Sequence, residues 1–218
     1  MGQVLAQLIP IALAVALSTV PITATLFILL SERRKATALP FLSGWVIGTA
    51  AGLILATLAA QALPGRPRQF ASLIENLEIL LGSALVLFGL VTLFRNRRRT
   101  QRSSWIEGIG SLDPLAALGI GLALNLRPKA LLLVSAAALS ISGGPPGVDR
   151  SDTLILIVVY TAIATSTVVV PILATLFFPE RMEPRLVVAR DWVSAHGPVV
   201  TGVVVILVGV VVLAAGIA

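Results

Sequence analysis

The chain has 218 residues, of which 57% are hydrophobic and 12% charged, with a mean hydropathy of +1.00 and a formal charge of +6. Soluble domains carry about 25% charged residues, so this composition excludes a soluble protein; it indicates an integral membrane protein whose basic excess lies in loops beside the spans, not in a nucleic-acid site. Because the sequence contains no cysteine and one histidine, thiolate metal sites, iron–sulfur clusters and thiol redox chemistry are excluded.

Six apolar segments are each long enough to cross a bilayer, which takes about 20 helical residues. They lie at about 4–30, 41–63, 77–94, 112–141, 153–178 and 192–217. Short connections with charged or turn residues separate them, the last of which is 179–191. The first segment has no basic region before it, so we expect it to remain as a span and not to be cleaved as a signal peptide. We therefore expect an all-α polytopic protein in which residues 1–218 form a single transmembrane domain.

The basic residues are distributed unequally between the two sets of connections. The connections after the first, third and fifth spans hold eleven Lys or Arg and the others hold three: Arg33, Arg34, Lys35, Arg95, Arg97, Arg98, Arg99, Arg102, Arg181, Arg185 and Arg190 against Arg66, Arg68 and Arg150. Short loops rich in Lys and Arg stay in the cytoplasm. We expect the first set, including a basic loop at about 95–107, to be cytoplasmic and both termini to lie outside.

The two halves of the chain share a motif. "ALSTVPI" at 16–22 and "ALNLRPK" at 123–129 both place a proline, Pro21 or Pro128, in the middle of a span. Three spans separate the motifs, so the halves cross the membrane in opposite senses, which is the arrangement of an inverted repeat. Proline-interrupted segments at matching places indicate a transporter's binding site. We expect two three-helix repeats, at about 1–95 and 108–218, although a simple structural kink at each proline stays open.

Each proline also leaves a backbone acceptor without its usual donor. Proline has no amide hydrogen to bond four residues back, which frees the carbonyls of Leu17 and Leu124. In hydrocarbon such groups need a partner. The neighbouring side chains that can serve are Ser18, Thr19 and Asn125, and water in a cavity is the alternative.

Arg127 and Lys129 lie near the middle of the fourth span. On a continuous helix they would point about 200° apart, so an interruption at Pro128 is needed to bring them to one ligand. None of the ten acidic residues falls in the middle of a predicted span, and buried cations are costly without a compensating group. This pattern predicts a site for an anion; the alternative is that both side chains snorkel to the headgroups.

Other polar residues in the spans are weaker candidates. The side chains proposed to line a pathway are Thr165, Ser166, Thr167, Pro171 and His196. Hydroxyl groups in spans often bond their own backbone or a neighbouring helix instead, and His196 is also consistent with an ordinary interfacial residue. Gly44, Gly48 and Gly52 are spaced four apart and predict a close helix contact.

Three motifs resemble one known family. They are "IPIALAVALSTVPI" from Ile9 with its Ser-x-x-Pro, "FLSGWVIG" from Phe41, and "LNLRPKALLL" from Leu124 with its Asn-x-x-Pro-Lys. In these motifs and in its span pattern the chain resembles the GAP family of peptidoglycolipid- or sulfolipid-addressing membrane proteins, within the lysine exporter (LysE) superfamily.

This resemblance implies a six-helix transporter of two inverted repeats that handles cell-envelope glycolipids or other small solutes. It implies that the matched positions lie near the substrate path: Ser18, Pro21, Asn125, Pro128 and Lys129. Arg127 lies at a variable position of the motif, so its role depends on its depth. Amino-acid exporters of this superfamily resemble one another in a Pro-Gly-Pro in the first span, where this chain has "TVPIT", and this departure disfavours an amino-acid substrate.

The sequence thus predicts a secondary transporter or flippase of the plasma (inner) membrane, not an enzyme. It would export an anionic or anionic-headgroup substrate, such as a cell-envelope lipid or glycolipid, by alternating access. Arg127 and Lys129 would attract the anion, while Ser18, Thr19 and Asn125 would bind polar groups. No P-loop is present in the sequence, so a gradient or a partner would supply the energy.

The expected partners are membrane lipids and the anionic substrate, without cofactor, metal or nucleic acid, and a homo-oligomer stays open. Two alternative functions also stay open: a non-transporting accessory factor of a lipid-export complex, and an exporter of a small amino-acid-like solute. The central positive charge disfavours a cation channel.

Overall fold

The computed structural model describes residues 2–62, 68–96, 113–142 and 150–217, and in this part of the chain it contains helices and no strand. The elements in order are α1 (Gly2–Ala16), α2 (Thr19–Leu29), α3 (Arg34–Ala62), α4 (Arg68–Asn96), α6 (Pro114–Ala123), the 3-10 helix η2 (Leu124–Leu126), α7 (Pro128–Ser142), α8 (Arg150–Phe177) and α9 (Pro179–Ile217). The all-helical prediction is confirmed. Most of the expected basic loop at 95–107 and the start of the second repeat at about 108 lie outside the described residues.

Two helices, α3 and α8, are each long and apolar enough to cross a membrane in one piece. Three further candidate spans are bent pairs of helical segments: α1 with α2 at 46°, α6 and η2 with α7 at 64°, and Pro179–Gly197 with Val199–Ala214 of α9 at 58°. The described residues therefore contain two to five candidate spans. The apolar part of α4, Ile79–Phe94, is shorter than a span, so the predicted count of six and the inverted repeat stay predictions.

The segment 179–191, expected as a connection, is helical and forms the first part of α9. Its charged residues suggested a loop, but they do not interrupt a helix when an apolar face accompanies them. Leu186 and Val193 supply that face, being 2% and 8% exposed. Pro179 stands at the first helical position, where a missing amide hydrogen costs nothing.

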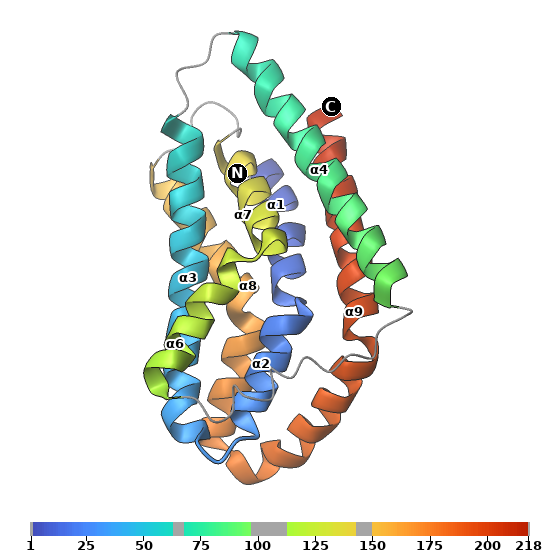
Figure 1. The fold of residues 1–218 in the computed structure, drawn as a ribbon. Coiled ribbons are helices and arrows are strands. Elements are labelled where there is room, and N and C mark those ends of the chain that lie inside the picture. The colour runs from blue at the N-terminus through green and yellow to red at the C-terminus, as the bar shows by residue number, and fades with distance from the viewer. Residues whose placement is uncertain (1, 63–67, 97–112, 143–149, 218) are drawn as a thin grey trace.

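Glycine allows two pairs of helices to touch backbone to backbone. A Cβ atom at Gly44 of α3 would overlap the carbonyl of Leu118 in α6, and one at Gly121 of α6 would lie 2.5 Å from the carbonyl oxygen of Phe41. α4 lies along the second half of α9 (Figure 1), where Gly89 and Gly202 make a similar contact. The predicted close contact is confirmed for Gly44 and, against Asn125, for Gly48; a Cβ atom at Gly52 would have nothing within 4 Å.

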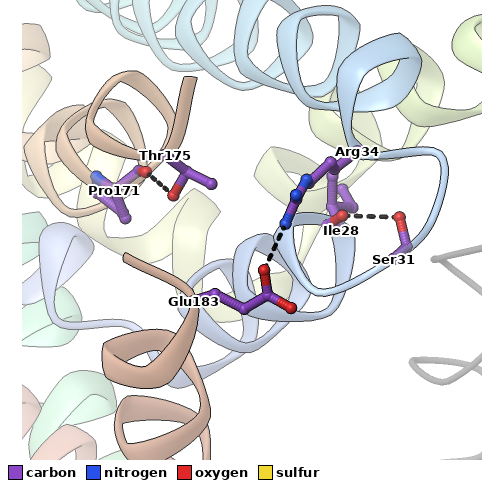
Figure 2. Close-up of polar contacts among 6 residues, drawn as sticks. All are labelled: Ile28, Ser31, Arg34, Pro171, Thr175 and Glu183. Atoms are coloured by element: carbon purple, nitrogen blue, oxygen red, sulfur yellow. Dashed lines mark hydrogen bonds and ion pairs between the residues drawn. The ribbon is translucent and has the colours of Figure 1, made fainter. Parts of the chain in front are cut away.

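Two ion pairs hold together connections that are far apart in the sequence. Arg33 pairs with Asp113, which precedes α6, and Arg34 pairs with Glu183 in α9, both at 3.4 Å. Figure 2 shows the Arg34–Glu183 pair beside the turn in which the Ser31 hydroxyl donates to the Ile28 carbonyl. In Figure 1 this end of the bundle lies opposite the two chain termini. Within the described residues, the segment after α2, the start of α6 and the first part of α9 therefore meet at one end.

Candidate functional site

The first span is interrupted at Ser18. α1 ends at Ala16, and Ser18 has an extended backbone with φ −70° and ψ 120° before α2 begins at Thr19. Pro21 is therefore in the first turn of a new helix, where its missing amide hydrogen is tolerated. The interruption falls three residues before Pro21 because a proline lacks the amide hydrogen that would bond the preceding turn and clashes with that turn's carbonyl. The helix therefore ends in the preceding turn and not at the proline itself.

The segment predicted as the fourth span, here the bent pair of α6 and η2 with α7, is interrupted at Arg127. α6 tightens into η2, and Arg127 is extended with φ −72° and ψ 147° before α7 begins at Pro128. A residue that precedes proline is driven out of the helical region by contact with the proline ring. Pro128 then starts α7 at the position that proline favours in helices. Each of the two copies of the motif "ALxxxPx" thus contains a break between two helical segments.

The carbonyls freed at these interruptions are satisfied by side chains, but not by the ones expected. The Leu17 carbonyl accepts from the Thr201 hydroxyl of α9 at 3.1 Å, and the Ala16 carbonyl from the Thr167 hydroxyl of α8 at 2.6 Å. The Leu124 carbonyl accepts from Nε of Arg127 at 3.1 Å. The expectation that Ser18, Thr19 and Asn125 bond the freed carbonyls was wrong, because these side chains have other partners: Ser18 contacts Lys129, Thr19 contacts Thr201, and Asn125 bonds Gly121 and Thr49.

Thr201 joins the first interruption to the bend of α9. Its hydroxyl oxygen lies 2.5 Å from that of Thr19 and accepts from the Thr19 amide at 3.3 Å. The bend of α9 separates Gly197 from Val199, and a Cβ atom at Gly197 would lie 2.7 Å from the Thr19 methyl group. The sequence reasoning missed Thr201, although a hydroxyl three residues after Pro198 in an apolar span was a usable signal.

Asn125 fastens η2 to α3. Its amide nitrogen donates to the Gly121 carbonyl at 3.1 Å, and its amide oxygen accepts from the Thr49 hydroxyl at 3.0 Å. Gly48 makes room, since a Cβ atom there would lie 2.6 Å from the amide nitrogen. Thr49 is a second residue that the sequence reasoning missed. The geometry gives Asn125 a positioning role at the interruption of the fourth span.

Lys129 connects the two interruptions directly. Its ammonium nitrogen lies 3.5 Å from the Ser18 hydroxyl oxygen, across 111 positions of sequence. Arg127, two positions earlier in the chain, donates from Nε to the Leu124 carbonyl at the interruption itself. Both side chains are partly buried, and neither forms an ion pair with a carboxylate among the described residues. The structure therefore gathers two cations at the point where both spans come apart.

The remaining candidates lie elsewhere. Thr165 and Ser166 donate to carbonyls of their own helix, and Pro171 lies inside the continuous α8, where its carbonyl accepts from Thr175 (Figure 2). His196 is exposed and stacks on Trp192, with ring centroids 5.4 Å apart. Of the pathway candidates, only Thr167 contacts an interruption.

The site contains hydrogen-bonding groups and cations. Among residues 2–62, 68–96, 113–142 and 150–217, no three histidine or acidic side chains gather where they could hold a metal ion. An ammonium and a guanidinium at partial burial favour an anionic ligand group, to which a lysine offers a point charge and an arginine a planar fork.

The fold and the site define a helical membrane protein with cations where two interrupted spans meet. The chain belongs to the sulfolipid-1-addressing protein (Sap) family, whose model matches residues 8–218. The family resemblance seen in the motifs is thereby confirmed. Comparison with curated proteins and with solved structures gave no match. Family and apolar helices together indicate a membrane protein involved in lipid export.

Proposed function

We propose that this protein moves a cell-envelope lipid or glycolipid with an anionic headgroup from the cytoplasmic to the outer face of the plasma membrane. The family is described by a sulfolipid, which is a lipid with an acidic headgroup. The interior of a bilayer offers such a headgroup neither water nor counter-ions. A carrier must therefore supply positive charge and hydrogen bonds at depth while its apolar surface accommodates the acyl chains.

The observation that carries the proposal is the 3.5 Å contact between Lys129 and Ser18. It places a cation between two interrupted spans with only a neutral hydroxyl as its partner among the described residues. An anion gains more from that ammonium group than the hydroxyl does, because its full negative charge adds a Coulomb attraction that the neutral hydroxyl lacks. A substrate headgroup can thus take the place of Ser18.

Displacement of Ser18 supplies a mechanism for alternating access. While Lys129 contacts Ser18, it holds the two interrupted spans together. Once Lys129 binds the headgroup instead, this link is broken and the halves can move relative to each other around the interruptions. Release on the far side restores the contact. The protein forms no covalent bond with its cargo in this scheme, so we propose a transporter and not an enzyme.

The same proposal includes orientation. The connections after α2 and α8 and the start of α6 meet at one end of the bundle through their ion pairs, and positive-inside distribution favours the cytoplasm for that end. Both termini would lie outside. Two repeats of opposite orientation, related through Ser18–Pro21 and Arg127–Pro128, would then form the LysE-type architecture.

Flux in proteoliposomes tests the function. Purified protein is reconstituted with a fluorescent sulfated glycolipid or its unsulfated counterpart, and transfer between leaflets is followed by quenching from outside. We expect transfer of the sulfated probe only, and its loss in Lys129→Gln but not in Arg190→Gln, whose side chain pairs with Asp191 away from the interruptions. Equal transfer of both probes would contradict the proposal.

The accessory-factor alternative gives a different result in the same experiment. A protein that only assembles an export complex moves neither probe when it is alone, but restores transfer when membrane extract is added. Flux of a free amino acid without flux of either lipid would instead support the solute-exporter alternative.

A further inference from the structure

A groove opens between α3 and α6. Its volume is about 690 Å³, within the roughly 300–1,000 Å³ of ligand pockets. Eight of its nine lining residues are apolar, among them Leu39, Leu42, Val46 and Ile47 of α3 and Leu115 and Leu118 of α6. Leu39, Ile47 and Leu115 are 50%, 56% and 83% exposed. The groove is therefore open to the surroundings of the bundle and is not part of the site at the interruptions.

The groove runs from the ion-paired end of the bundle to the crossing of the two helices. Pro114 lines it and directly follows Asp113, the partner of Arg33. Leu118 also lines it and provides the carbonyl that Gly44 meets at the crossing. The lining hydroxyl, that of Ser43, donates to the Pro40 carbonyl at 2.8 Å. An apolar chain lying here would meet no free donor from the wall.

A cation lies at the ion-paired end of the groove. Of the three consecutive basic residues there, Arg33 and Arg34 have carboxylate partners, whereas Lys35 is exposed and pairs with no described carboxylate. Lys35 precedes Leu39 by four residues and Leu42 by seven, so the three side chains share one face of α3. The Lys35 backbone thus precedes that of Leu39, the first groove residue of α3, by about one helical turn, roughly 6 Å along the axis.

We propose that this groove binds one acyl chain of an anionic phospholipid, with the headgroup phosphate at Lys35. Lipid tails are as apolar as leucine side chains, so an acyl chain gains little by leaving the bilayer for the groove. Selectivity must come from the headgroup, and a basic residue at the membrane surface favours an anionic lipid about fivefold. The occupant is a resident membrane lipid, and its binding does not depend on transport by the protein.

Photocrosslinking in nanodiscs tests the proposal. The full-length protein is reconstituted with phosphatidylglycerol that carries a diazirine in one acyl chain, and labelled peptides are mapped by mass spectrometry. We expect labels concentrated in 39–47 and 114–118 over the equally accessible Leu55 and Leu58 of α3, which are 66% and 56% exposed and lie outside the groove. Phosphatidylcholine with the same chains should label the groove about fivefold less.

Two pairs of variants separate the contributions of the groove and the charge. Ile47→Trp narrows the groove and should abolish the concentrated labelling, whereas Leu58→Trp, at the same exposure of 56%, should not. Lys35→Gln should remove the preference for phosphatidylglycerol, and Arg185→Gln, an exposed basic residue of α9, should preserve it. All four positions are exposed, so size-exclusion profiles should match that of the unaltered protein.

Three results would overturn the proposal. Labelling spread evenly over the exposed apolar residues would show ordinary bilayer contact. Equal labelling by both lipids, or a preference that survives Lys35→Gln, would remove the role of the headgroup. Protein-to-protein crosslinks at 39–47 would show that a second copy of the chain fills the groove.

Discussion

The ammonium nitrogen of Lys129 lies 3.5 Å from the hydroxyl oxygen of Ser18, so a single side chain joins the two places where spans are interrupted. Ser18 is 7% exposed and belongs to the extended turn between α1 and α2. Lys129 is the second residue of α7. This relationship leads to the first two predictions, which assign different roles to the two central cations.

Replacement of Lys129 should stop transport without unfolding the protein. In Lys129→Gln the charged partner of the headgroup is lost, and because a hydrogen bond to a charged group contributes about 1.5–3 kcal/mol, flux of the sulfated probe should fall at least about tenfold. Lys129→Arg keeps the charge and should retain part of the flux. Circular dichroism checks that helix content is unchanged. Normal flux in Lys129→Gln would refute the assigned role.

Replacement of Arg127 should reduce stability as well as transport. Its Nε satisfies the Leu124 carbonyl, so Arg127→Leu leaves a backbone acceptor without that donor, at a cost of about 1–3 kcal/mol. We expect a lower midpoint of thermal unfolding in detergent for this variant and little change for Lys129→Gln. If the two variants unfold at the same temperature, the distinction between a structural and a ligand-binding cation is wrong.

Thr201→Val should loosen the first interruption. Valine has the shape of threonine but cannot bond the Leu17 carbonyl or Thr19, and bonds between membrane helices average about 0.6 kcal/mol each. The free energy of unfolding should decrease by about 1–2 kcal/mol for the set. Thr92→Val is the matched control, because the Thr92 hydroxyl donates within its own helix to Phe88. A comparable loss in both variants would argue against a special role of Thr201.

Two glycines of α3 should respond differently to the same substitution. A Cβ atom at Gly44 would overlap the Leu118 backbone, whereas one at Gly52 would have nothing within 4 Å. Gly44→Ala should force α3 and α6 apart and destabilise the protein by about 1–3 kcal/mol, as overpacking does. Gly52→Ala should be neutral or stabilising by about 0.5–1 kcal/mol, the helix preference of alanine. Thermal unfolding of the two variants side by side measures this difference.

Introduced cysteines should report the arrangement of the ends cleanly, since the sequence has no cysteine of its own. Arg34→Cys with Glu183→Cys should be joined by a bifunctional thiol crosslinker long enough to replace the two native side chains, whose ends approach to 3.4 Å. In intact cells an impermeant thiol reagent should label Ala62→Cys, at the exposed end of α3, but not Lys35→Cys. Labelling of Lys35→Cys from outside would reverse the proposed orientation.

Local properties of the chain predicted the class and the places of interruption. Composition and the length of the apolar runs indicated a membrane protein. A helix formed by such a run satisfies its own backbone hydrogen bonds, which lipid requires. Pro21 and Pro128 indicated the interruptions, which fall at Ser18 and Arg127, because a missing amide hydrogen and a ring clash act on the preceding turn whatever surrounds it. The same local view failed at 179–191, where charged residues concealed a helix that is mostly exposed and buries Leu186.

Only the tertiary structure showed which side chains from other helices form hydrogen bonds at the interruptions. The sequence showed that the Leu17 carbonyl lacks a donor, but the donor is Thr201, 184 positions away, and Thr167 reaches Ala16 across 151 positions. The packing of the helices also places Asn125 of η2 against Thr49 of α3 and Lys129 of α7 beside Ser18. Whether a backbone carbonyl lacks a hydrogen-bond donor depends on a few consecutive residues, whereas the group that donates to it depends on which helices pack together.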